Sequence, residues 1–212
     1  MEINMIEKNT FASAKKNKRL AVTVAICLAG ALLICILLTV LMQSLTFGGE
    51  EYETRPPVNP SKLHETYAED FNIMEYEEYL GLDRNIYHDD KQSGVLQSVP
   101  YDKASTFGEP FVLMYDVILA IIGGDNVQYN SYMGAERLKT GEFTQQQLYN
   151  IKISPYSSSE SNGCEEYVFK VTYCIHENNG TYRNTIESDV SRPQYFYIDN
   201  STGSFKVMNI TE

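Results

Sequence analysis

The longest apolar run in the chain places the strongest constraint on its organisation. Residues 20–42, LAVTVAICLAGALLICILLTVLM, form 23 consecutive positions without a charged side chain. As a helix, this run would be roughly 35 Å long at about 1.5 Å per residue. The hydrocarbon layer of a bilayer is about 30 Å thick, so we expect a transmembrane helix over residues 20–42.

The charges on either side of this run predict its orientation. Residues 15–19, KKNKR, place four cations just before it, and the first charges after it are Glu50, Glu51 and Glu53. Basic residues stay on the cytoplasmic side of a membrane. We therefore expect the N-terminus inside the cell and the chain after residue 42 outside the plasma membrane.

A cleaved secretory signal peptide is the alternative interpretation of the same run. Such peptides carry an apolar region of about 7–15 residues and small residues at the cleavage site. The run of residues 20–42 is longer, and residues 42–47, MQSLTF, contain no A-x-A pattern. This favours an uncleaved signal anchor that spans the membrane once.

Charge and composition divide the remaining chain. Residues 1–19 form a tail with a net charge of +3, so the rest must carry −14 for the whole chain to total −11. An acidic outer part does not suit nucleic acid, whose phosphates need basic partners. Glycines and prolines in residues 43–65 predict a stalk, residues 66–104 an acidic lead-in of helix and loop, and residues 105–212 the folded domain.

The lead-in is rich in carboxylates but lacks the spacing of a metal site. Aromatic and apolar residues at helical intervals predict a helix that breaks near Gly81. The acidic residues do not follow the D-x-D-x-D-G order of a calcium loop, and the tripeptide HDD at residues 88–90 is interpreted as a loop. We expect no metal and no cofactor.

The start of the folded domain predicts a buried helix. Thr106 and Glu109 have the spacing of a capping box, and the run PFVLMYDVILAII follows with one charged residue. A helix that is apolar on nearly all sides belongs inside a core. Gly123 is expected to end it in the left-handed conformation, and Asp125 to cap a second short helix that reaches Met133.

The next stretch predicts a helical turn, a strand and a loop. Thr144 and Gln147 form a second capping-box pattern, with Phe143 placed to pack onto Leu148. A strand is expected over about residues 150–154. The serine-rich residues 155–162 are interpreted as a loop.

From residue 165 onward, the pattern is that of strands. Residues 166–176 alternate between aromatic or aliphatic and polar side chains with period two. Residues 178–180, NNG, predict a hairpin turn with a partner strand over residues 181–187. A second hairpin is expected from residues 195–199, the turn at 200–203, and residues 205–210.

The two cysteines of the outer part are expected to remain free thiols. Cys164 and Cys174 lie at either end of the predicted strand. Ten extended residues span about 33 Å, whereas a disulfide allows about 7 Å between Cα atoms.

The order of elements implies an α+β domain with helices on one face of a curved antiparallel sheet. The buried helix, the stretch GDNVQYNS at residues 124–131, Phe143-Thr144 and the long hairpins resemble the NTF2-like (cystatin-like α+β cone) superfamily over residues 105–212. The layout of basic tail, single span and outer domain is similar to VirB8/TcpC-type components of bacterial conjugation machinery. In enzymes of this superfamily, the resemblance implies a carboxylate or a His–Asp pair inside the cone.

No motif of a known catalytic class occurs in the chain. There is no H-E-x-x-H, G-x-S-x-G, Walker loop or G-x-G-x-x-G, and His64, His88 and His176 are isolated in the sequence. We therefore expect no enzyme. Five tyrosines are candidates for lining a cavity in the cone, with a filled aromatic core as the alternative. They are Tyr115, Tyr129, Tyr173, Tyr195 and Tyr197.

These observations favour a non-enzymatic, membrane-tethered protein whose outer domain binds protein partners in an envelope assembly. Two alternatives stay open. One is an immunity or inhibitor protein whose acidic surface meets a basic secreted toxin. The other is a small-ligand pocket or enzyme inside the cone. The sequence leaves the identity of the partner and the oligomeric state open.

Overall fold

The structure is a computed structural model that describes residues 55–68 and 71–212. The predicted basic tail, the membrane span at residues 20–42 and the first part of the stalk lie outside the described residues. Within those residues, no helix combines the length and the apolar character needed to cross a bilayer. The chain divides into two compact units between Glu53 and Thr54, and the second unit is described here.

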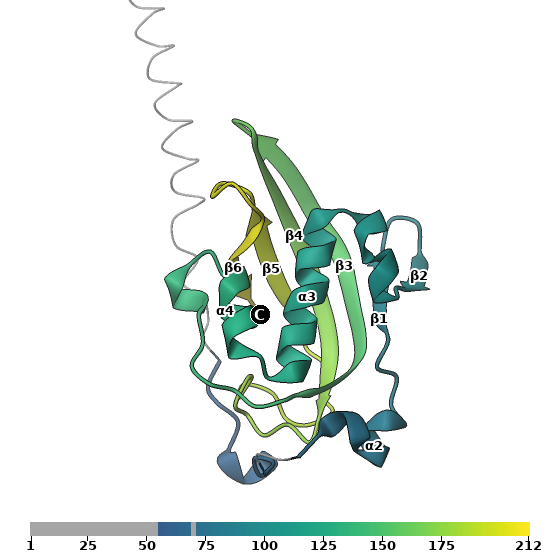
Figure 1. Cartoon of the computed structure of the whole chain (residues 1–212), viewed down its shortest axis with the longest axis vertical. Helices are drawn as coiled ribbons and strands as arrows, with labels where there is room; N and C mark the ends of the chain where they lie inside the picture. Colours follow the sequence, from purple (N-terminus) through teal and green to yellow (C-terminus); the bar gives the residue numbers. More distant parts are fainter. Residues whose placement is uncertain (1–54, 69–70) are drawn as a thin grey trace, which may run out of the picture. The chain divides into compact units, whose positions relative to one another are not determined.

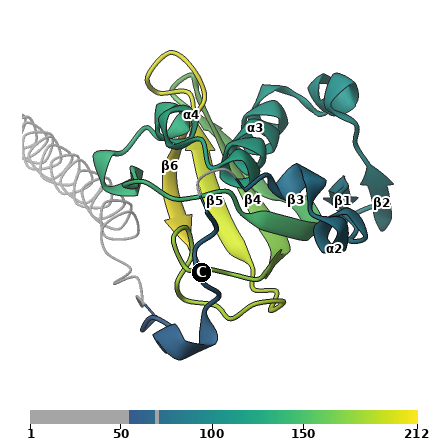
Figure 2. The ribbon, with the colours of Figure 1, turned by 60° about the horizontal axis from the view of Figure 1, so that its bottom comes forward.

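The second unit is an α+β fold built on a mixed sheet, which confirms the predicted class. The sheet has six strands in the order β2-β1-β3-β4-β5-β6. The long helix α3 (Glu109–Gly123) and the short helix α4 (Asn126–Tyr132) lie on one face of this sheet (Figure 1, Figure 2). The strands are β1 (Ile86–Asp90), β2 (Val95–Ser98), β3 (Gln147–Ser161), β4 (Cys164–His176), β5 (Gln194–Asp199) and β6 (Lys206–Thr211).

One pairing departs from the antiparallel sheet that we predicted. β1 runs parallel to β3, with Ile86 opposite Ile151 and His88 opposite Ile153. Parallel neighbours need a long crossover connection, and here the segment containing α3 and α4 supplies it.

The apolar helix α3 forms the centre of the core, as predicted. Met114, Ile118 and Ile121 are fully buried, whereas Leu119 is 42% exposed. The helix belongs to one continuous core with the inward side chains of β4, which are Phe169, Val171, Tyr173 and Ile175. The period-two pattern of residues 166–176 therefore identified the inward face of this strand correctly.

The ends of α3 differ from the prediction in detail. Gly124, not Gly123, adopts the left-handed conformation, and the Asp125 amide donates to the Ala120 carbonyl in a Schellman arrangement. Asp125 caps α4 through the Gln128 amide, as expected. The capping box of Thr106 and Glu109 is wrong, because a 3-10 helix (Tyr101–Phe107) precedes α3 and the Thr106 hydroxyl donates to the Lys103 carbonyl.

The lead-in contributes less helix and more strand than predicted. A 3-10 turn (Ile73–Glu75) and the one-turn helix α2 (Glu77–Leu80) stand where a longer helix was expected, although α2 does end at Gly81. The HDD tripeptide is not a loop, because it forms the end of β1. Asp89 is tolerated in this buried strand because Lys91 and Ser154 satisfy its carboxylate.

The predicted serine-rich loop is wrong, because β3 continues through it. The strand passes Pro155 and the serines and turns back into β4 at residues 162–163. Proline lacks an N–H for the ladder, and here it sits at a register shift between Pro155 and Ser157, where one residue is unpaired. The predicted helical turn at Thr144 is also absent, since its hydroxyl contacts Thr181 and Asn179 instead.

The hairpin predicted at residues 178–180 does not form. β4 already has β3 and β5 as neighbours, so a strand at residues 181–187 has no place beside it. The chain leaves the sheet at Glu177, and the buried Asn178 side chain closes a loop by donating to the carbonyls of Arg183 and Ile186. The second hairpin, β5–β6, is confirmed, as are free thiols at Cys164 and Cys174.

The end of α3 provides a matched pair of glycine substitutions. A Cβ at Gly124 would lie 2.6 Å from the Gln145 backbone nitrogen at a φ of +66°, whereas a Cβ at Gly123 meets nothing within 4 Å. We expect Gly124→Ala to lower the free energy of unfolding by about 2 kcal/mol or more. Gly123→Ala should leave it unchanged or raise it by up to about 1 kcal/mol. Urea unfolding followed by circular dichroism measures both, and equal effects would contradict this assignment of the helix end.

Candidate functional site

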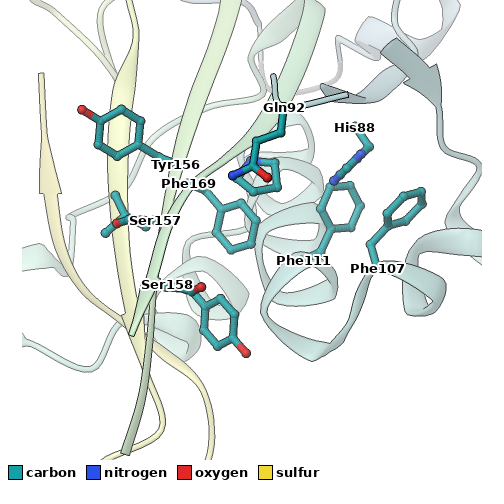
Figure 3. Close-up of a pocket in the computed structure, with 11 residues that line it drawn as sticks. His88, Gln92, Phe107, Phe111, Tyr156, Ser157, Ser158 and Phe169 are labelled. Atoms are coloured by element: carbon teal, nitrogen blue, oxygen red, sulfur yellow. The ribbon is translucent and has the colours of Figure 1, made fainter. Parts of the chain in front are cut away.

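A pocket of about 420 Å³ opens where the β3–β4 hairpin faces β1 and the start of α3 (Figure 3). The segments around it come from distant parts of the sequence. The lining residues are His88, Gln92, Phe107, Phe111, Pro155, Tyr156, Ser157, Ser158, Tyr167, Val168 and Phe169.

Aromatic rings make up much of the pocket wall. Phe107 ends the 3-10 helix and Phe111 lies in the first turn of α3, so their rings come within 5.0 Å between centroids. Phe111 meets Phe169 edge-on at 6.4 Å, and Tyr167 stacks parallel to Phe169 at 6.5 Å. Such walls suit a flat or branched apolar group.

His88 is the one ionisable side chain among the aromatic walls that can change charge near neutral pH. Its imidazole stacks on Phe107 at 4.3 Å and meets Phe111 edge-on at 5.4 Å. Burial lowers the pKa of His88, and this outweighs the opposite effect of Asp90 and Asp89. The neutral ring therefore offers one donor and one acceptor to a bound group, alongside the Gln92 amide and the Ser157 and Ser158 hydroxyls.

The pocket lining carries few titratable groups. It includes one imidazole, two tyrosine hydroxyls and no carboxylate. A single imidazole is one ligand, whereas a zinc site usually combines three or four protein ligands.

The pocket adjoins a free edge of β3. β1 pairs with β3 only through Ile86–His88 opposite Ile151–Ile153. Beyond that point, residues 155–161 pair with β4 on one side, and among the described residues no strand pairs with them on the other. Tyr156, Ser157 and Ser158 belong both to this edge and to the pocket lining. Outward-pointing backbone groups along the edge are thus available for pairing.

Acidic side chains lie at the tip of the β3–β4 hairpin. Glu160 lies on β3, and Glu165 and Glu166 lie opposite on β4, where they accept hydrogen bonds from Tyr167 and Ser159, respectively. Lys152 and Lys170 lie further from the tip, and Lys91 is paired with Asp89. Negative charge is therefore concentrated at the hairpin-tip end of the free edge.

The five tyrosines predicted to line a cavity fall into two groups, and none lines this pocket. Tyr115, Tyr129 and Tyr173 are buried in the core. The Tyr115 hydroxyl donates to the Val99 carbonyl, and the Tyr173 hydroxyl donates to Gln194 Oε1 at 2.5 Å. Tyr195 and Tyr197 lie on the other face of β5 from the buried Phe196 and Ile198, and Tyr195 contacts Tyr156 at 5.2 Å between ring centroids.

Sequence reasoning missed the pocket because its signals were assigned to other structures. The sequence pattern predicts a loop at His88 and another loop at Ser157 and Ser158, whereas all three residues lie in strands. The aromatic spacing of Phe107 and Phe111 was the available signal, since both rings fall on one side of the junction between the 3-10 helix and α3.

Comparisons with protein families, with curated proteins and with solved structures each gave no match.

The environment of His88 predicts a measurable pH effect. Because the folded protein disfavours the protonated ring, unfolding takes up a proton as the pH falls below about 6.5, the ordinary histidine value. The free energy of unfolding should therefore fall with pH in that range, and His88→Asn should remove part of this dependence. A proton NMR titration should give a midpoint for His88 below the ordinary value. A midpoint above it would contradict the desolvated position of the ring.

Proposed function

We propose that residues 54–212 form a non-catalytic domain that binds an extended segment of a partner protein along the free edge of β3. One observation carries this proposal. The unpaired edge at residues 155–161 and the aromatic pocket share the residues Tyr156, Ser157 and Ser158. An added strand could thus form backbone hydrogen bonds and insert a side chain into the pocket at the same time.

The shape of the pocket and the charges near it indicate which side chains the partner segment should carry. A strand places alternate side chains on opposite faces, so one of them can enter the pocket whose wall includes Phe107, Phe111 and Phe169. An aromatic or branched apolar side chain fits these walls. Basic residues beside it would meet Glu160, Glu165 and Glu166, which favours a cationic partner.

Exposed tyrosines extend the proposed contact area. Tyr156 is 65% exposed and Tyr197 is 38% exposed, and Tyr195 lies against Tyr156. Tyrosine is enriched at protein interfaces because it combines a large apolar ring with a polar tip. Tyr156 would border a strand added at β3, whereas Tyr195 and Tyr197 lie two strands away on β5.

We further propose that the chain carries a membrane anchor and that its outer domain has an NTF2-like fold. The charge-free run at residues 20–42 and the basic residues before it support a single-span anchor in the plasma membrane, with the binding domain outside. The helices on one face of the sheet are compatible with the NTF2-like resemblance. We place the protein in an envelope assembly, as VirB8/TcpC-type architecture suggests.

Peptide binding tests the proposed site. A fluorescein-labelled peptide in which lysine alternates with phenylalanine or valine should bind the detergent-solubilised full chain, with a Kd on the order of micromolar. Ser158→Trp should weaken binding at least tenfold because the indole would occupy the mouth of the pocket. Fluorescence anisotropy measures both values.

Two controls make this test specific. Ser204→Trp places the same side chain in the exposed turn between β5 and β6 and should not change the affinity. A peptide with glutamate in place of lysine should bind at least tenfold more weakly because of the acidic residues beside the edge. Equal affinities of the two proteins carrying tryptophan would place binding elsewhere.

Two other functions would give different results. The pocket volume lies within the range of small-molecule sites, so a thermal shift with a small apolar compound and no peptide binding would favour a ligand-binding domain. A crosslinking pull-down from the native membrane distinguishes an envelope assembly from an immunity or inhibitor function. Several envelope components would support the assembly, and a single basic secreted protein would support an immunity or inhibitor function.

The anchor is tested by membrane fractionation. The full chain should stay almost entirely in the membrane pellet after washing with alkaline carbonate, and deletion of residues 20–42 should release it. Protease added to intact cells should digest the domain after residue 54 and leave the N-terminal tail intact. Protection of the domain would reverse the predicted orientation.

A further inference from the structure

A second cluster of titratable side chains lies at the end of β4 away from the hairpin with β3. His176 and Glu177 come from the end of β4, and Glu78 comes from α2, which Figure 1 shows at the opposite end of the sheet from the hairpin tip. One ligand atom from each of these three residues lies within 4.8 Å of the other two. His64 approaches the same group, with Nε2 at 3.6 Å from Glu177 Oε1.

Hydrogen bonds determine which nitrogen of each histidine carries a proton. His176 Nδ1 lies 3.1 Å from Asp189 Oδ1, and His64 Nδ1 lies 2.7 Å from the Glu65 carbonyl oxygen. Neither oxygen has a proton to give, so each Nδ1 must be the donor. In the neutral ring, Nε2 then presents a lone pair, and both lone pairs face the carboxylates of this cluster.

The distances across the cluster do not fit direct hydrogen bonds. His176 Nε2 is 3.9 Å from Glu78 Oε2, and His64 Nε2 is 3.6 Å from Glu177 Oε1. A charge-assisted hydrogen bond would be about 2.7–2.9 Å long. His176 Nε2 is also a buried atom without a hydrogen-bond partner among the described residues. A cation placed between these nitrogens and the anionic oxygens would be bound by both.

The groups behind the cluster hold its side chains in place. Asp189 orients His176 and also accepts a hydrogen bond from the Tyr149 hydroxyl. Tyr67 donates to Glu177 Oε2 at 2.7 Å. The Tyr76 hydroxyl lies 3.2 Å from Glu78 Oε2 and 3.4 Å from Glu177 Oε1, so it would turn away from one of these oxygens when an ion binds. This carboxylate–histidine arrangement is the usual second shell of a protein metal site.

Glu177 is held by hydrogen bonds at the centre of the cluster. The side-chain amide of Gln147, a residue that is 1% exposed, donates to its Oε2 at 3.3 Å. Its backbone has a φ of +47°, a strained conformation that bends the chain out of the sheet at this point.

We propose that Glu78, His176 and Glu177, joined by His64, bind one divalent transition-metal ion of the Zn²⁺ type. Zinc bonds to imidazole nitrogen and carboxylate oxygen are about 2.0–2.2 Å long, so two ligand atoms of one tetrahedral ion lie about 3.4 Å apart. The ligand atoms of Glu78, His176 and Glu177, now up to 4.8 Å apart, would move together to reach that value, and His64 would move in to join them. Two imidazoles among the ligands favour zinc over calcium or magnesium, which prefer oxygen.

The proposed ion would fasten the segment before β1 to the sheet. His64 and Glu78 lie in that segment, whereas His176 and Glu177 lie at the end of β4. Because the ion would bind these distant parts of the chain only when they are folded together, it should stabilise the folded state. This site is separate from the β3 edge, so its test is independent of peptide binding.

The test is a titration of the metal-stripped full chain in detergent with Zn²⁺ alone. Calorimetry should give one Zn²⁺ per chain, and a hundredfold excess over Kd should raise Tm by about 5–10 °C. His176→Ala and Glu177→Gln should each weaken binding at least a hundredfold, and His64→Ala at least tenfold. Ca²⁺ at the same concentration should leave Tm unchanged.

Control variants separate this site from other sources of zinc binding. His88→Ala removes a histidine outside the cluster and should leave Zn²⁺ affinity unchanged. The Co²⁺-loaded chain should show no strong thiolate absorption, which excludes the cysteines as ligands. If Glu177→Gln fails to fold by circular dichroism, His64→Ala decides, because that side chain is 40% exposed. Zinc affinity undiminished in the folded His176 and His64 variants, or an equal response to Ca²⁺, would overturn the proposal.

Discussion

The packing of one apolar helix against the inward face of β4 determines the rest of this fold. Val117, Ile118 and Ile121 of α3 are completely buried, as are Val171 and Tyr173 of β4. Removing this apolar surface from water is the main favourable contribution to folding. Once α3 occupies that face, its first turn lies beside the base of the β3–β4 hairpin. The position of the pocket therefore follows from the position of the helix.

Local sequence patterns predicted the elements whose structure depends on their own residues. The run from Pro110 to Ile122 identified a buried helix, and the alternation over residues 166–176 identified an inward strand face. Asp125 predicted the start of α4 because its side chain accepts a hydrogen bond from the backbone amide three residues later in the chain. In each case the signal and the structure lie within a few residues of one another.

Elements whose structure depends on distant partners were not predictable in this way. The serines of β3 have no strong strand preference, and they are extended because β4 pairs with them. The HDD tripeptide becomes a strand because β2 pairs with it, β3 pairs with its first residue, and Ser154 and Lys91 satisfy Asp89. His64 and His176 looked isolated along the chain, yet both approach Glu177 in the folded domain. The candidate sites depend on such contacts, and hence on the fold.

The parallel pairing of β1 with β3 also has a consequence for the order of folding. Ile86 pairs with Ile151, so β1 has only β2 as a partner until the crossover and the first part of β3 are present. Closing so long a loop carries an entropic cost that local hairpins avoid. A chain that begins to fold during synthesis presents β1 and β2 well before their place in the sheet exists. During that interval Val95 and Leu96, which are also exposed in the finished fold, lie on a strand pair without a sheet, so this segment is the first that a chaperone would meet.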